Sequence, residues 1–340
     1  MSPDLTDKPV NSTVPPGLDI CLRGFADQNE AQSVGRLVGD GLRLLGQSLN
    51  LGGLEGVIVA HDYDEALASI DRGTETSAPL TRTNDDRATG MAMAPAVLRN
   101  GVVKHYIVLE ANLAKCLIRS PDDQLFHMAV YTLAHEASHV HDVTARDRAY
   151  PGVIMRERVP TRKEEILISI ADACWAEYAA SRLSACFSPE QIKSYEETFC
   201  GSLSQARARA NACIRSYRRH GNHDQILREV SGEYGSLLKY ASYLLGHAAG
   251  LQANLGDIAP LSVQTIEREN YFKPVFESLR QALEEQWAVY GEWKWPQIYD
   301  GLCGVAENLL RIGGLIMTNH AQGTRVDLPF TAATIPSLFG

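Results

Sequence analysis

The chain has 340 residues, of which 45% are hydrophobic and 21% are charged, enough to bury the core of one large domain or two ordinary ones. Lys and Arg number 32 against 41 Asp and Glu, so the net charge is -9, and without a dense basic run we expect no nucleic-acid partner. Seven cysteines, an odd number with no CxxC pair, argue against a disulfide framework and against a thiolate zinc knuckle.

The N-terminal residues and the most apolar stretches indicate in which compartment the protein is expected. Residues 1–17 lack the basic start and apolar core of a secretory signal, and their prolines and hydroxyl residues predict a disordered lead-in. The apolar stretches at 237–251 and 302–317 contain charged residues and are too short for a membrane span. We therefore expect a cytoplasmic protein without membrane contacts.

The first hundred residues predict alternating helices and strands. Apolar residues at spacings of three and four predict a helix at 27–49. A β-rich run predicts a strand at 54–60, and a second helix is expected at 64–70. The polar run at 71–90 predicts a loop. Asn100-Gly101, the residue pair that a two-residue type I′ turn prefers, separates runs 91–99 and 102–110. We expect an antiparallel hairpin there.

Helices dominate the rest of the sequence. Ser120-Pro121-Asp122-Asp123 predicts the start of a helix over 121–143, followed by a charged loop at 144–160. Thr161 and Glu164 have capping-box spacing and begin a helix that should run to about 187. Beyond Pro189 we expect helices to about 318, broken near Gly221, 256–260, Pro274 and Pro296. The fold class is therefore α+β.

The helix predicted over 121–143 contains His135-Glu136-Ala137-Ser138-His139. Two imidazoles four residues apart lie on one helical face, about 6 Å from each other, and both can bind one metal ion. Zinc accepts neutral imidazole and leaves its fourth position to water at catalytic sites, where Glu136 would act as general base. The alternative is a surface helix with two solvated histidines.

A third ligand has to come from another segment. Asp142 and Ala145 stand where the metzincin pattern requires Gly and His, so we look to an acidic residue on a later helix. Glu177 falls in a stripe expected to face the core, formed by Ile166, Ile170, Ala173, Glu177, Ala180 and Ser184. A carboxylate seldom lies there unpaired, so a metal ion or a salt bridge to Arg or Lys should accompany Glu177.

The segments TLAHEASHVHD (132–142) and WAEYAASRLSACFSP (175–189) resemble the gluzincin class of zinc metallopeptidases, and within it are most similar to the ImmA/IrrE-like group. The resemblance implies a zincin-like N-terminal half, with helices, a small twisted mixed sheet, an active-site helix and a glutamate helix. It implies His135, His139 and Glu177 as ligands of one Zn²⁺ per chain, with Glu136 as catalytic base. A mostly α-helical C-terminal half follows.

Other polar residues are candidates for supporting roles. Asp142 lies on the ligand face and would accept a hydrogen bond from a ligand imidazole, or be an ordinary acid in the last helical turn. His141 points elsewhere and is expected to be packed or solvated. Hydrolysis also needs a donor to the oxyanion, for which the candidates are Tyr178, Tyr240, Tyr243 and His247, although helical spacing of this kind also suits core packing.

The sequence thus predicts a disordered lead-in at 1–17, a zincin-like metallopeptidase domain at 18–188, and a helical region at 189–340 that packs on the first as one unit. The expected function is that of a zinc endopeptidase acting on a protein or peptide substrate. The alternatives are a catalytically silent binding or regulatory protein on a zincin scaffold, and a helical interaction protein in which the histidine pair is accidental. The sequence leaves the oligomeric state open.

Overall fold

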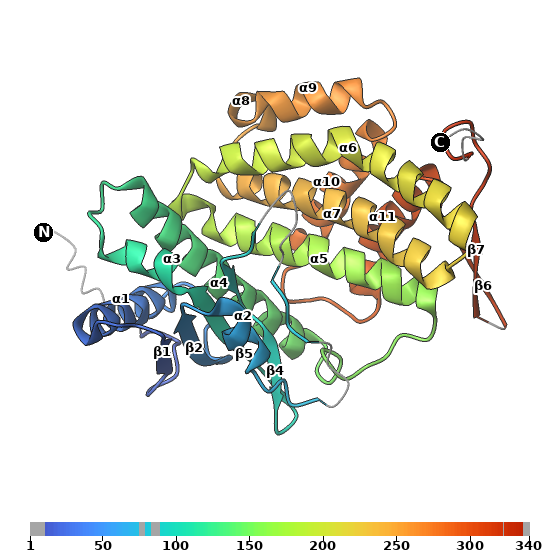
Figure 1. Cartoon of the computed structure of the whole chain (residues 1–340). Coiled ribbons are helices and arrows are strands. Elements are labelled where there is room, and N and C mark those ends of the chain that lie inside the picture. Colours follow the sequence, from blue (N-terminus) through green and yellow to red (C-terminus); the bar gives the residue numbers. More distant parts are fainter. Residues whose placement is uncertain (1–10, 75–78, 83–88, 322, 336–340) are drawn as a thin grey trace, which may run out of the picture. The chain divides into compact units, whose positions relative to one another are not determined.

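The computed structural model describes residues 11–74, 79–82, 89–321 and 323–335. The chain divides into two compact units, Met1–Met155 and Arg156–Gly340. The α+β class is confirmed, since helices accompany a small mixed sheet in the first unit and a two-stranded sheet in the second (Figure 1). The helix with Glu177, which the sequence assigned to the first domain, lies in the second unit.

The first unit alternates strands and helices before it ends in one long helix. Its elements in chain order are β1 (Asp19–Arg23), α1 (Gln28–Leu45), β2 (Leu54–Ala60), α2 (Tyr63–Ala68), β3 (Ala92–Met93), β4 (Ala96–Arg99), β5 (Val102–Glu110), α3 (Ala111–Lys115), the 3-10 turn η1 (Cys116–Ile118) and α4 (Gln124–Ala149). The part of the predicted lead-in at 1–10 lies outside the described residues. The predicted loop at 71–90 is described only in part.

The sheet of this unit is mixed. β1, β2 and β5 are parallel neighbours, and β3 and β4 pair antiparallel with the other side of β5. The predicted hairpin is confirmed: Asn100 and Gly101 have φ angles of 51° and 77°, the left-handed values that a type I′ turn requires. Its first strand is interrupted, because residues 94–95 separate β3 from β4.

Helices cover both faces of the sheet. On one face α2 buries Tyr63, Ala66 and Leu67 against Ile58 and Val108. On the other face α4 packs against β5 and α1. The face that α4 covers carries the alternating side chains Val103, His105, Ile107 and Leu109, all of them buried.

Helix α4 differs from its prediction at both ends. It begins at Gln124, after Asp123 accepts a hydrogen bond from the Leu125 backbone N–H, and it continues to Ala149, so the predicted loop at 144–160 is wrong over its first third. One of the charges that suggested a loop, Arg146, is paired along the helix. Asp142 and Arg146 form a buried ion pair of 2.8 Å at the i,i+4 spacing.

The second unit is a layered set of helices. Its elements are α5 (Arg162–Ser184), the 3-10 turn η2 (Ala185–Phe187), α6 (Gln191–His220), α7 (His223–Gly250), α8 (Leu255–Ile258), α9 (Pro260–Arg268), α10 (Lys273–Ala288), the 3-10 turn η3 (Gln297–Tyr299), α11 (Asp300–Ile312), β6 (Ile316–His320) and β7 (Gly323–Asp327). The capping box of Thr161 and Glu164 is confirmed. The hairpin of β6 and β7 was not predicted, because helix was expected to residue 318.

Close packing of α5 against α7 holds this unit together, and α6 packs on the other side of α7 (Figure 1). Glycines allow the approach. A Cβ added to Gly246 would overlap the backbone carbonyl of Tyr178, and one added to Gly250 would overlap that of Arg182. Helix α5 is therefore fixed against α7 along its C-terminal half, the half that carries Glu177.

Within the described part of the chain, none of the helices is both long and apolar enough to cross a membrane.

Candidate metal centre

Helix α4 presents His135 and His139 one turn apart. The helix is anchored by its buried apolar residues, among them Leu133, Ala134 and Val140, so its rotation about its axis is fixed. The two imidazole rings have centroids 4.8 Å apart and lie nearly perpendicular to each other, at 86°. His135 is 7% exposed and His139 is half-buried. This is the arrangement that the HExxH spacing predicts.

Glu136 follows the first histidine and is also buried, with 7% of its surface exposed. It is one residue away from His135, so its side chain leaves the helix about 100° around the axis. On the opposite side of the motif the Ser138 hydroxyl donates a hydrogen bond of 2.7 Å to the Ala134 carbonyl, which satisfies that group within the helix. The side chain of Glu136 is therefore largely shielded from bulk water.

Glu177 lies in the C-terminal half of α5 and is half-buried. The stripe predicted to face the core includes it, but only part of that stripe is core: Ala173 and Glu177 are half-buried, whereas Ile170 and Ala180 are buried. Glu164 accepts the Thr161 backbone N–H in the capping box, as predicted.

These three residues form a group. Each residue offers one potential ligand atom, and the three atoms, from His135, His139 and Glu177, lie within 4.8 Å of one another. Donors that bind one ion at about 2.0 to 2.2 Å are separated by 3 to 4 Å, so this group is close to that geometry. Two imidazoles and a carboxylate also make a chemically suitable donor set. A His-His-Glu group that could bind a metal ion is therefore present.

Asp142 and His141 follow the motif on α4. Asp142 is fully buried and forms its ion pair with Arg146; a hydrogen bond from a ligand imidazole to Asp142 stays a prediction. His141 accepts a hydrogen bond of 2.7 Å at Nδ1 from the Asn50 backbone N–H, and burial lowers its pKa. His141 thus connects α4 to the segment before β2 and is a packed histidine, as expected.

The candidate oxyanion donors differ in their surroundings. The Tyr178 hydroxyl accepts a hydrogen bond of 2.7 Å from Arg182, and its ring packs against Trp175 and Trp287 at 6.0 and 6.2 Å. Burial raises the Tyr178 pKa, and the charge of Arg182 opposes that shift. Tyr178 is therefore part of an aromatic cluster, and that cluster accounts for its burial.

Tyr240, Tyr243 and His247 lie together on α7, as their spacing predicted. Tyr243 packs against Tyr195 of α6 at 4.9 Å, and His247 packs against the same ring at 5.6 Å. Tyr240 stacks on Tyr243 at 6.5 Å. The four rings make one cluster between α6 and α7, and a role of Tyr240, Tyr243 or His247 as oxyanion donor stays a prediction.

Sequence reasoning missed His105 and Tyr63, which are among the buried polar residues of the first unit. His105 on β5 is 1% exposed, and burial lowers its pKa to about 4, with the charges of His139 and Arg146 acting in the same direction. Its Nδ1 lies 3.2 Å from the Ala94 carbonyl, so Nδ1 carries the proton of the neutral ring. The signal was present: His105 occupies an inward position in the alternating pattern of β5.

Tyr63, the first residue of α2, is the second. It is fully buried, and burial followed by the charge of Glu136 raises its pKa far above the usual tyrosine range. The hydroxyl therefore keeps its proton at all ordinary pH values and can only be a neutral donor or acceptor. Glu136 thus has a phenol among its electrostatic neighbours.

Comparisons with known proteins identify no relative: no family model, curated protein or solved structure matches the chain.

Proposed function

We propose that this chain is a zinc-dependent endopeptidase in which His135, His139 and Glu177 bind one Zn²⁺ and Glu136 is the general base. The observation that carries the proposal is the grouping of the three ligand atoms within 4.8 Å, with a buried acid between the two histidines in sequence. Two imidazoles and one carboxylate are a ligand set that catalytic zinc sites use, leaving a fourth position for water or substrate.

The chemistry can be assigned to the residues of the chain. A bound zinc ion lowers the pKa of water toward neutrality and polarises a peptide carbonyl. Glu136 accepts a proton from the water molecule while the oxygen of that water attacks the carbonyl carbon. Glu136 then delivers that proton to the amide nitrogen as the C–N bond breaks, so the products are a carboxylic acid and an amine. Burial of Glu136 keeps bulk water from competing for this proton.

Zinc is favoured over other ions by the donors. Oxygen-only sets select Mg²⁺ and Ca²⁺, and thiolates select softer ions, whereas imidazole with one carboxylate suits zinc and its neighbours in the first transition row. Zinc also needs no redox partner. All seven cysteines are unpaired, which agrees with a reducing compartment and supports a cytoplasmic location as part of the proposal.

The test combines metal analysis with one isosteric substitution. We expect the purified chain to hold one zinc per molecule and to cleave unfolded casein, and we expect Glu136→Gln to keep the zinc while losing cleavage. Glu197→Gln, a surface change on α6, is the matched control and should keep both. Full cleavage by Glu136→Gln would remove Glu136 from the mechanism.

The same preparations decide against the competing function. In a binding or regulatory protein with a structural metal, a chelator would lower the melting temperature strongly while no preparation cleaved casein. The proposed endopeptidase loses cleavage on chelation and regains it when zinc is added back.

A further inference from the structure

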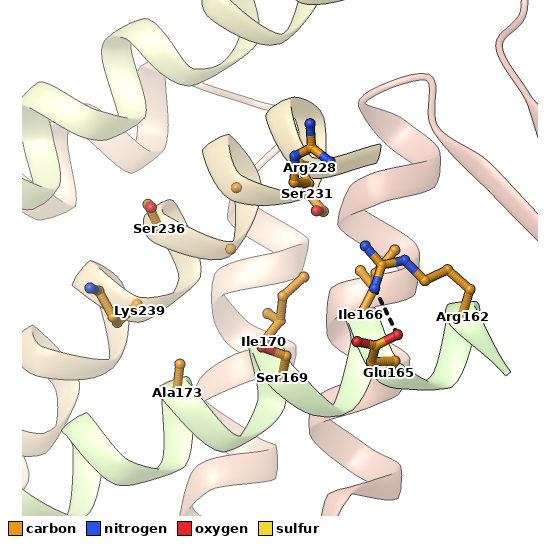
Figure 2. A pocket seen from close by; sticks show the side chains of 12 residues that line it. Arg162, Glu165, Ile166, Ser169, Ile170, Ala173, Arg228, Ser231, Ser236 and Lys239 are labelled. Carbon is orange, nitrogen blue, oxygen red and sulfur yellow. Dashed lines mark hydrogen bonds and ion pairs between the residues drawn. The ribbon is translucent and has the colours of Figure 1, made fainter. Parts of the chain in front are cut away.

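An open groove runs between α5 and α7, entirely within the second unit. Its volume is about 370 Å³, which falls in the range of small-ligand and peptide side-chain pockets. Figure 2 shows Ala173 and Lys239 at one end of the groove and Arg162, Ile166 and Arg228 at the other. The floor contains Ile170, and small or hydroxyl residues line both walls.

The charge of this groove is opposite to that of the protein. Three cations line it, Arg162, Arg228 and Lys239, against one acid, Glu165, in a chain whose net charge is -9. Arg162 is neutralised by Glu165 at 2.7 Å. In the part of the chain that the structure describes, Arg228 and Lys239 form no ion pair; Lys239 lies over the Tyr240 ring at 5.4 Å. Two positive charges thus face the groove without an acidic partner.

The space between these two cations is created by small residues. Gly232 lies on the groove wall, and a Cβ added there would meet no atom within 4 Å. Gly235, by contrast, would bring a Cβ to 3.1 Å from Ile170, so it marks where the helices close on each other. The hydroxyls of Ser169 on α5 and Ser236 on α7 line the two walls and can donate hydrogen bonds to a ligand.

The positions of the cations suit an extended peptide. Arg228 and Lys239 are eleven residues apart on α7, which places them on the same helical face and about 16 Å apart along the axis. An extended chain covers that distance in about five residues. At the Lys239 end, Ala173 is one helical turn before Glu177, about 6 Å along α5, or about two residues of extended peptide.

We propose that this groove binds an acidic stretch of the peptide substrate, with one carboxylate at Lys239 and a second, about five residues further on, at Arg228. The first acidic residue lies about two positions from the bond that is hydrolysed. This assignment rests on the proposed function for the identity of Glu177 as a zinc ligand. It adds the substrate class: peptides with acidic residues on one side of the cleaved bond.

Binding is measured first, because it does not depend on hydrolysis. The probe is a fluorescein-labelled peptide of Ala, Gly and Ser with two Glu residues five positions apart, and its counterpart has Gln in both places. Fluorescence anisotropy is recorded with the full chain carrying Glu136→Gln and loaded with zinc. We expect the Glu peptide to bind at least about tenfold more tightly, and its advantage to shrink at high salt.

Substitutions locate the binding in the groove. Lys239→Glu and Arg228→Glu should each raise the dissociation constant of the Glu peptide about fivefold. Lys294→Glu makes the same charge change on an exposed residue of this unit outside the groove and should have little effect. Equal effects of Lys239→Glu and Lys294→Glu, or equal binding of the Glu and Gln peptides, would overturn the assignment.

A steric variant tests the groove without changing charge. Gly232→Leu places a side chain in the open space and should weaken binding of the Glu peptide. Gly201→Leu is the control, because Gly201 on α6 also has no atom within 4 Å of an added Cβ and lies outside the groove. Both changes replace a helical glycine and should leave folding intact, so a loss with Gly232→Leu alone supports occlusion.

Cleavage then separates this inference from the proposed function. With Glu136 restored, cleavage is compared for peptides that share one central sequence and carry Glu or Gln two positions before it or two positions after it. Glu should speed cleavage relative to Gln on one of these two sides and not on the other. Binding through Lys239 without hydrolysis of any peptide would keep the groove and refute the endopeptidase. Hydrolysis of casein without any preference for Glu would keep the endopeptidase and refute the groove.

Discussion

Acid should destabilise the first unit through one buried imidazole. His105 is 1% exposed on β5, and its pKa is lowered from 6.5 to about 4, chiefly by burial. In the folded chain the ring therefore stays neutral down to about pH 4, whereas in the unfolded chain it takes up a proton below about 6.5.

The sign and size of the effect follow from this difference. Between pH 6.5 and 4 the unfolded state binds more protons, so the free energy of unfolding falls as the pH falls through that window. The pKa difference corresponds to about 3 kcal/mol, lost progressively and complete near pH 4. For a domain of this size such a loss is a large part of the total stability.

The assay is urea denaturation at a series of pH values with a chelator present, so that metal binding does not contribute. His105→Gln removes the titrating group, and its amide can still donate to the Ala94 carbonyl. His320→Gln, at an exposed position on β6, is the matched control. We expect the unfolding free energy of wild type and of the His320 variant to fall by about 3 kcal/mol more between pH 6.5 and 4 than that of His105→Gln.

Parallel pH profiles for all three proteins would contradict the reasoning. That result would mean that the imidazole of His105 reaches water or a charged partner in the folded state, and that its burial does not suppress protonation.

Three further single substitutions and one double replacement test the packing around the proposed metal ligands. Gly246→Ala should destabilise the chain by about 2 to 3 kcal/mol in urea denaturation, because the new Cβ overlaps the backbone of Tyr178; Gly232→Ala, with open space around it, should stabilise by up to about 1 kcal/mol. Asp142→Ala should cost about 3 kcal/mol because Arg146 loses its buried counterion, and replacing both by apolar residues of similar size should recover most of that loss. An unchanged unfolding free energy for Gly246→Ala would refute the close packing of α5 on α7. A loss of stability in Asp142→Ala that the double replacement does not reduce would refute the role of the buried ion pair.

Local signals predicted the elements that position the histidines. Asn100-Gly101 fixed the hairpin, Thr161 and Glu164 fixed the start of α5, and the HExxH spacing brought two rings to 4.8 Å. Each signal depends on residues within one turn of each other, so a single sequence contains all the information that it needs.

The features that escaped prediction depend on distant partners. β1 exists through its parallel pairing with β2, more than thirty residues later, and its own sequence alternates little. The α5 stripe with Glu177 was assigned to the core, but periodicity cannot show that α7 leaves an open groove lined by Ile170 and Ala173. The burial of His105 likewise depends on which helix covers β5.

The central claim is that Glu177 joins the two histidines at one ion. Its most direct test is a zinc titration against a competing chromophoric chelator, comparing wild type, Glu177→Ala and, as a control on the same helix, Glu165→Ala. The account predicts one site per chain and a loss of affinity of at least about 100-fold for Glu177→Ala alone, since even the loss of a residue that only orients a ligand costs 10- to 100-fold. Equal zinc affinities for Glu177→Ala and Glu165→Ala would contradict it.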